Sequence, residues 1–117
     1  MEAFSPLSGH GESLTVEQVT ADEAAVTISA RTTTTEATCP ACGNVSSHRH
    51  GRYRRRLNDL ASSGRRTMID LVVQRFRCLA ATCPRRTFVE QVDGLTEPFA
   101  RRTTRLRRMF ERLMLVL

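Results

Sequence analysis

Short runs of alternating apolar and polar residues recur between residues 13 and 92, and this two-residue period is typical of β-strands. In the first part of the region, Val26, Ile28 and Ala30 alternate with polar residues. The turn-prone segment 21–23 precedes them, so residues 13–32 are predicted to form a β-hairpin.

Three more strand regions follow this hairpin. Residues 45–57 are polar and basic with short alternations, and a turn is expected across residues 58–64. Residues 65–77 predict a strand that is apolar on part of both faces and is therefore sandwiched. One face carries Ile69, Leu71 and Val73, and the other carries Met68, Val72 and Phe76. Residues 87–92 are the last predicted strand.

The apolar spacing becomes helical at Pro98, a residue that suits a first helical turn. The stripe that follows comprises Phe99, Leu106, Phe110, Leu113 and Leu117. Residues 113–117 are all apolar, and no stop signal follows them. We therefore expect the helix to pack on a partner: the N-terminal hairpin, a second copy of the chain, or the remainder of a truncated longer protein.

The composition fits one small domain. The chain has 117 residues, of which 40% are hydrophobic and only 5% aromatic, so its core is thin and a staple is expected. No apolar run is long enough to cross a membrane, and residues 1–14 do not resemble a signal peptide. We expect a cytoplasmic protein, where paired cysteines bind metal more often than they form disulfides.

The four cysteines have the spacing of a zinc ribbon. Cys39 and Cys42 form one close pair, Cys78 and Cys83 form another, and a strand-bearing insert separates the pairs. Two such knuckles complete a closed tetrahedral site of four thiolates. Two disulfides and a redox motif are the alternatives, which the compartment and the absence of a thioredoxin-like βαβ pattern disfavour. His48 or His50 could replace a cysteine, but both lie on a basic strand, where contact with solvent or phosphate is the simpler interpretation.

The predicted architecture is α+β, a small zinc ribbon of antiparallel β-hairpins with an N-terminal hairpin and a C-terminal α-helix. Its predicted divisions are a flexible tail at 1–12, a hairpin at 13–36, the four-cysteine domain at 37–92 and the helix at 93–117.

Charge is divided unevenly along the chain. Residues 1–36 contain one arginine and six acids, whereas residues 37–117 contain seventeen arginines and six acids, and the chain has no lysine. A basic segment that follows an acidic one indicates a polyanionic partner, although a solvated basic face is the simpler alternative. Alternate arginines on a strand lie about 6.6 Å apart, close to the phosphate spacing of a DNA strand. The predicted DNA contacts are Arg52, Arg54, Arg55, Arg56, Arg65, Arg66, Arg75, Arg77, Arg85, Arg86, Arg101 and Arg102.

Four stretches form a combined pattern: CPACGNVSSHRHGRYRRRLNDL at 39–60, VQRFRC at 73–78, CPRRTFVE at 83–90 and PFARRT at 98–103. Together they resemble the N-terminal zinc-finger region of bacterial insertion-sequence transposases of the ISL-three group. The resemblance covers residues 36–117. It implies that the four cysteines hold Zn²⁺, and that Arg101, Arg102 and Thr103 open the first helix of a helix-turn-helix that is truncated here.

By the same resemblance, the function is recognition of the double-stranded terminal inverted repeats of an insertion sequence, at the nucleoid. The C-terminal helix would then contact a second copy or a full-length transposase. A catalytic role is not expected, because strand transfer needs three carboxylates on a large core that holds two metal ions, and this chain has no room for it. The alternative is a zinc ribbon that binds RNA or protein, for which Tyr53 and Phe88 are the candidate aromatic platform.

Overall fold

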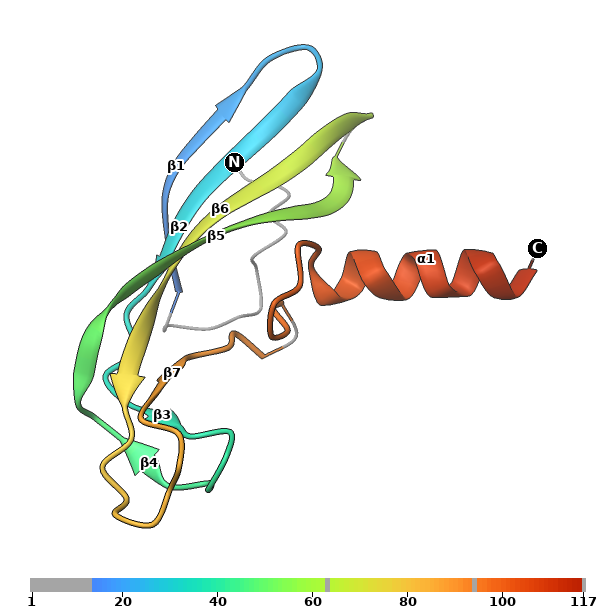
Figure 1. Ribbon diagram of the computed structural model, residues 1–117. Helices are drawn as coiled ribbons and strands as arrows, with labels where there is room; N and C mark the ends of the chain where they lie inside the picture. Colours follow the sequence, from blue (N-terminus) through green and yellow to red (C-terminus); the bar gives the residue numbers. More distant parts are fainter. Residues whose placement is uncertain (1–13, 63, 94, 117) are drawn as a thin grey trace.

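A computed structural model of the protein describes residues 14–62, 64–93 and 95–116 (Figure 1). The predicted tail at 1–12 lies outside the described residues. In chain order the elements are β1 (Leu14–Ala21), β2 (Ala25–Thr32), β3 (Ala37–Thr38), β4 (Val45–Ser46), β5 (Arg49–Ser62), β6 (Arg65–Arg77), β7 (Thr87–Val89) and α1 (Thr104–Val116).

Strands β1 and β2 form the predicted N-terminal hairpin, and they pair in the antiparallel sense. The turn between them is closed by the Asp22 carboxylate, whose Oδ1 accepts hydrogen bonds of 2.8 Å from the backbone N–H groups of Ala24 and Ala25. These two bonds favour the charged carboxylate and lower the pKa of Asp22. The side chain therefore supplies the turn chemistry that the sequence indicated.

A long second hairpin, β5 and β6, lies beside the first (Figure 1). Strand β2 runs parallel to β6, with Ala25 opposite Arg66 and Arg31 opposite Val72. The main sheet therefore has the order β1-β2-β6-β5, and β7 pairs with the far end of β6. The antiparallel hairpins are confirmed, but the parallel junction was not predicted, because it joins strands far apart in the sequence and no turn signal marks it.

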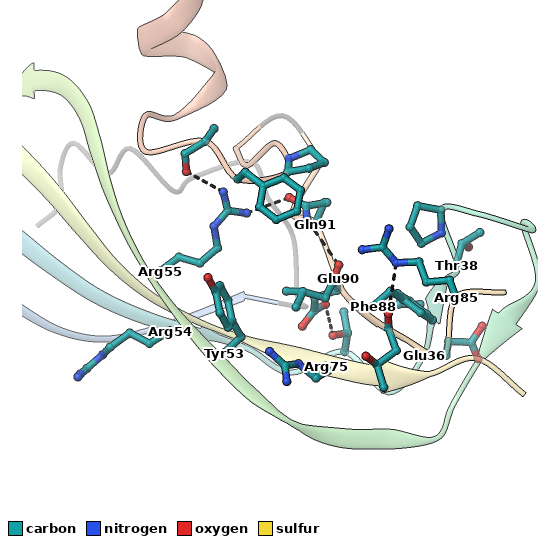
Figure 2. A pocket seen from close by; sticks show the side chains of 18 of the residues that line it. Glu36, Thr38, Tyr53, Arg54, Arg55, Arg75, Arg85, Phe88, Glu90 and Gln91 are labelled. Atoms are coloured by element: carbon teal, nitrogen blue, oxygen red, sulfur yellow. Dashed lines mark hydrogen bonds between the residues drawn. The ribbon is translucent and has the colours of Figure 1, made fainter.

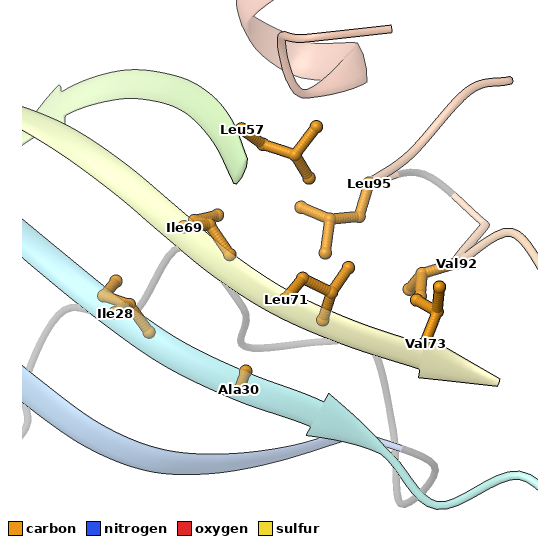
Figure 3. Close-up of a cluster of buried hydrophobic side chains, with 8 residues drawn as sticks. All are labelled: Ile28, Ala30, Leu57, Ile69, Leu71, Val73, Val92 and Leu95. Atoms are coloured by element: carbon orange, nitrogen blue, oxygen red, sulfur yellow. The ribbon is translucent and has the colours of Figure 1, made fainter. Parts of the chain in front are cut away.

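The main core lies on one face of this sheet (Figure 3). The predicted face of β6 is confirmed, since Ile69, Leu71 and Val73 are fully buried. Ile28 and Leu57 join them from the strands on either side, and the loop beyond β7 covers the cluster, whose full membership is Ile28, Ala30, Leu57, Ile69, Leu71, Val73, Val92 and Leu95. Phe76 faces the other way on a regular strand and is also fully buried, so β6 is covered on both faces at that end.

Strand β5 is longer than expected. It continues through Asn58 and Asp59, where the sequence indicated a turn. Both residues are used to hold the C-terminal segment: the backbone of Asn58 bonds to Arg101 and Thr103 at 2.9 Å, and the buried Asp59 carboxylate accepts from Thr103 and Arg105. These long-range contacts override the local turn preference of the two residues.

The helix begins later than predicted. Helix α1 starts at Thr104, and the predicted start at Pro98 is wrong. Thr103 is the N-cap, since its Oγ1 accepts a hydrogen bond of 3.2 Å from the N–H of Leu106. The preceding segment instead follows β5, where Asn58 forms an isolated bridge with Arg102. Arg101, Arg102 and Thr103 therefore precede the helix rather than open it.

The apolar stripe of α1 is only partly covered. Leu106 is buried near β5, whereas Phe110 and Leu113 are 39% and 51% exposed. Leu117, also assigned to the stripe, lies outside the described residues. Figure 1 shows α1 extending away from the sheet. The helix therefore does not pack on the N-terminal hairpin, which was one of the partners expected for it. Among the described residues, no helix is long and apolar enough to cross a membrane.

Candidate metal centre and nucleic-acid surface

The four cysteines meet at the end of the molecule opposite the tip of the β1–β2 hairpin. Their Sγ atoms all lie within 4.8 Å of one another, and the pairs Cys39–Cys83 and Cys42–Cys78 are 3.8 and 3.6 Å apart. A tetrahedral Zn²⁺ with Zn–S bonds of about 2.3 Å requires sulfur atoms about 3.8 Å apart. The four thiols are therefore grouped as a zinc ion requires, and two of the sulfur pairs are already at this spacing.

The first knuckle is a miniature hairpin. Strands β3 and β4 flank it, the N–H of Cys39 donates to the carbonyl of Asn44, and the N–H of Gly43 donates to the carbonyl of Cys39, both at 2.9 Å. Gly43 has a φ of 81°, a conformation that a residue without Cβ adopts at little cost. The glycine after Cys42 thus closes the turn that places both thiols on one side.

The second knuckle follows β6 directly. The N–H of Cys78 donates to the carbonyl of Arg86 at 2.9 Å, and the N–H of Cys83 donates to that of Ala80 at 3.2 Å. The two knuckles are tied together because the Ser46 hydroxyl donates to the carbonyl of Arg77. The four-residue spacing between Cys78 and Cys83 therefore forms a compact loop.

Backbone dipoles favour ionisation of Cys39. Burial opposes the Cys39 thiolate, but the N–H groups of Ala41 and Cys42 point at its sulfur, and with help from the neighbouring thiols they lower the pKa of Cys39 to about 7. A thiolate is the form that binds metal, so this first ligand is available near neutral pH.

The comparison with known families found one similarity, and it covers the segment that carries the knuckles. Residues 35–83 match the family model described as the zinc-finger of transposase IS204/IS1001/IS1096/IS1165. This segment is therefore similar to a transposase zinc finger. The match is to a zinc finger and not to a catalytic domain. No curated protein and no solved structure is similar enough to the chain to count as a match.

Cys39, Cys42, Cys78 and Cys83 are the side chains placed to hold Zn²⁺, and an ion bound there would join the two knuckles into one unit. Neither His48 nor His50 belongs to the cluster of metal-ligating side chains found among the described residues. Both are exposed, and His50 Nδ1 lies 3.4 Å from an Arg77 nitrogen. The simpler interpretation of the two histidines is therefore supported.

The arginines of β5 alternate between two faces. Arg52, Arg54 and Arg56 lie opposite Gln74, Val72 and Asp70 of β6, on the face away from the main core, and all three are exposed. Arg54 is 70% exposed and forms an ion pair of 3.0 Å with Asp70. We call these three residues the outer arginine row.

Arg55 is different, and its assignment as a DNA contact is corrected. It points to the core side, where it is buried. Its guanidinium donates to Gln91 Oε1 at 2.9 Å and to the carbonyls of Glu97 and Ala100 at 2.6 and 2.9 Å. Because these bonds occupy the side chain inside the protein, Arg55 is a structural clamp between β5 and the segment before α1.

The other predicted arginines are spread over four places. Arg65 and Arg66 lie at the hairpin tip near Asp22, and Arg77 and Arg86 lie beside the knuckles. Arg102 stands 4.7 Å over the Phe110 ring. The remaining three line a pocket beside β7: Arg75, Arg85 and Arg101. The twelve residues therefore do not form one continuous surface.

Of the two residues predicted to form an aromatic platform, Tyr53 is exposed and Phe88 is not. Phe88 is buried and stacks on Phe76 with ring centres 5.8 Å apart, next to Cys39. Tyr53 is 44% exposed, as a platform requires. Sequence reasoning missed Phe99, which it placed in a helix and which is 94% exposed in a turn. A Glu-Pro-Phe-Ala segment before a threonine N-cap is the signal that could have placed it outside the helix.

Proposed function

We propose that this chain is the DNA-binding module of a transposase, that it recognises the terminal inverted repeats of an insertion sequence, and that it does not cut or join DNA by itself. The outer arginine row is the observation that supports the proposal best. Three exposed guanidiniums stand at alternate positions of one strand, about 6.6 Å apart. That interval is close to the phosphate separation along a DNA strand, about 6–7 Å.

The test is the salt dependence of duplex binding, measured by fluorescence anisotropy. If the module neutralises roughly five phosphates, log affinity falls against log salt with a slope of about −4 to −5. The double variant Arg52→Gln, Arg56→Gln removes two of these charges and should make the slope shallower by about 1.8. Neither side chain has an ion pair among the described residues, so folding should be unaffected.

A matched control removes the same charge elsewhere. The double variant Arg108→Gln, Arg112→Gln changes two exposed arginines of α1 and should leave the slope within error of the parent. Equal slopes for the parent and the β5 variant would contradict the proposed contact. Sequence recognition is tested by comparing the affinity for the inverted repeat that flanks the gene with the affinity for a scrambled duplex of the same composition. Equal affinities would contradict sequence recognition.

We also propose that α1 contacts a second copy of the chain or a full-length transposase. The half-exposed side chains of Phe110 and Leu113 on one side of the helix support this. The variant Leu113→Glu should shift the protein toward monomer in sedimentation while leaving its zinc content intact. A parent protein that is monomeric at all concentrations would contradict self-association.

A further inference from the structure

A second surface borders the outer arginine row and has different chemistry. It is a pocket of about 960 Å³ between β5, β7 and the segment before α1. Its lining includes two aromatic rings and three arginines that the proposed DNA contact does not use: Tyr53, Phe99, Arg75, Arg85 and Arg101. Arg54 and Arg56 of the outer arginine row also border it. Figure 2 shows Tyr53, Arg75 and Arg85 around this pocket.

Phe99 is held in an unfavourable conformation. Its φ is 61°, in the left-handed region that a bulky residue rarely adopts. It is the third residue of a turn that the N–H of Ala100 closes on the carbonyl of Glu97, with Pro98 second. Glycine is the usual third residue where such a turn needs a positive φ. A strained backbone that presents a large ring to solvent indicates a binding role rather than a folding role.

The surrounding contacts hold Phe99 in place. Arg55 donates to the carbonyls of Glu97 and Ala100, so one buried guanidinium clamps both ends of the turn. The same guanidinium reaches Gln91, whose Oε1 also accepts from the Thr96 hydroxyl at 2.9 Å. The exposed ring is therefore presented by a fixed loop, which lowers the entropy cost of binding a ligand against it.

Tyr53 supplies a second ring in the same pocket. Its side chain projects from β5 on the pocket side, and the Arg75 guanidinium lies 5.7 Å from the ring centre. Exposed aromatic rings beside arginines are the combination by which proteins bind unpaired nucleobases, because every base can stack on a ring while guanidiniums bind the phosphates. The exposed arginines of the lining give it the positive charge that a nucleic-acid strand requires.

We propose that this pocket binds an unpaired nucleobase of a DNA strand, which stacks on Phe99 or Tyr53 while Arg75 and Arg85 contact the adjoining phosphates. The inference rests on the proposed DNA-binding function and extends it: the outer arginine row contacts duplex, and the pocket contacts a strand that leaves the duplex. Arg54 and Arg56 border both surfaces, but Phe99 and Tyr53 are outside the outer arginine row and can be changed without altering it.

The experiment uses the full chain loaded with zinc and two probes, a blunt DNA duplex and the same duplex with a single-stranded DNA tail. We expect tighter binding of the tailed duplex and quenching of tyrosine fluorescence on binding. Tyr53 is the sole tyrosine and the chain has no tryptophan, so this emission reports on the pocket alone. Loss of one stacked ring in Phe99→Ala should weaken tailed binding about 5- to 150-fold and leave blunt binding unchanged.

Two further variants separate binding from folding. Phe99→Gly should raise the thermal stability, because glycine accepts the positive φ, while it loses the preference for the tail. Phe110→Ala removes another exposed aromatic outside the pocket and should keep the preference. A Phe99→Gly variant that is no more stable than the parent would contradict the assigned strain.

The possible failures are distinguishable. Blunt binding that follows the expected salt slope, with no gain from the tail or an equal gain in Phe99→Ala, would overturn the pocket proposal and leave the duplex proposal standing. Absence of blunt binding would overturn the duplex proposal, and the same tail tested as a free strand would then decide the pocket alone. An RNA tail bound more tightly than the DNA tail would overturn the assignment to DNA.

Discussion

The zinc end and the sheet end of this molecule are held together by different physical means. At the zinc end, β3 and β4 have two residues each, and the buried cluster contains only Cys39, Phe76 and Phe88. In the sheet, β5 and β6 have 14 and 13 residues and share an eight-residue apolar cluster with their neighbours. A bound metal would therefore stabilise the zinc end, where few apolar residues are buried, whereas apolar packing stabilises the sheet.

Removing zinc should have the largest effect. Structural zinc in small fingers binds with an apparent free energy of about 10–16 kcal/mol, and this energy is available for folding. Chelation, or the substitution Cys42→Ser, should unfold the two knuckles and lower the thermal midpoint. Metal analysis should find one zinc per chain in the parent, and adding zinc back after chelation should restore the midpoint. An unchanged melting curve in the presence of chelator would contradict a stabilising role for zinc.

Truncating a side chain in the main core of the sheet should lower the stability by less, and without loss of zinc. Leu71 is fully buried in the main cluster, so Leu71→Ala should cost about 2–5 kcal/mol of unfolding free energy. The zinc content should not change, because Leu71 lies outside the cluster around Cys39. Denaturant unfolding and metal analysis on the same sample check both statements. Loss of zinc together with stability would mean that the two ends form one cooperative unit.

The attachment of α1 provides the third and smallest effect. The buried Asp59 carboxylate accepts from Arg105 Nη2 at 2.6 Å, from its Nε at 2.8 Å and from Thr103 Oγ1 at 2.7 Å. Asp59→Asn weakens these charge-assisted bonds and should cost about 1.5–3 kcal/mol. Trypsin should then cut the arginine-rich helix sooner.

The control for this variant is Asp70→Asn. It breaks the pair with Arg54, which is mostly exposed, and should cost at most about 1 kcal/mol. Equal losses of stability from the two variants would show that Asp59 does not anchor the helix.

The sequence predicted those features whose signals are local. The cysteine spacing located the metal centre, and the alternation Ile69, Leu71, Val73 located the buried face of β6, because a strand's period of two directly records which side chains face the core. The hairpin at 13–32 was found for the same reason.

The errors came from contacts between distant segments. The parallel pairing of β2 with β6 leaves no trace in either strand. Asn58 and Asp59 favour a turn by themselves but are held in β5 by residues beyond position 100. The strand period places Arg55 on the opposite face from Arg54 and Arg56, but its burial depends on the distant carbonyls of Glu97 and Ala100, which the sequence does not reveal.

Hydrogen exchange followed by mass spectrometry, with zinc and with a chelator, tests most directly the claim that metal and apolar core each hold their own end. We expect peptides covering 37–48 and 78–86 to lose protection from exchange when zinc is removed, while peptides covering Ile69–Val73 keep their protection. Equal loss of protection along the whole chain, or no change at the knuckles, would contradict it.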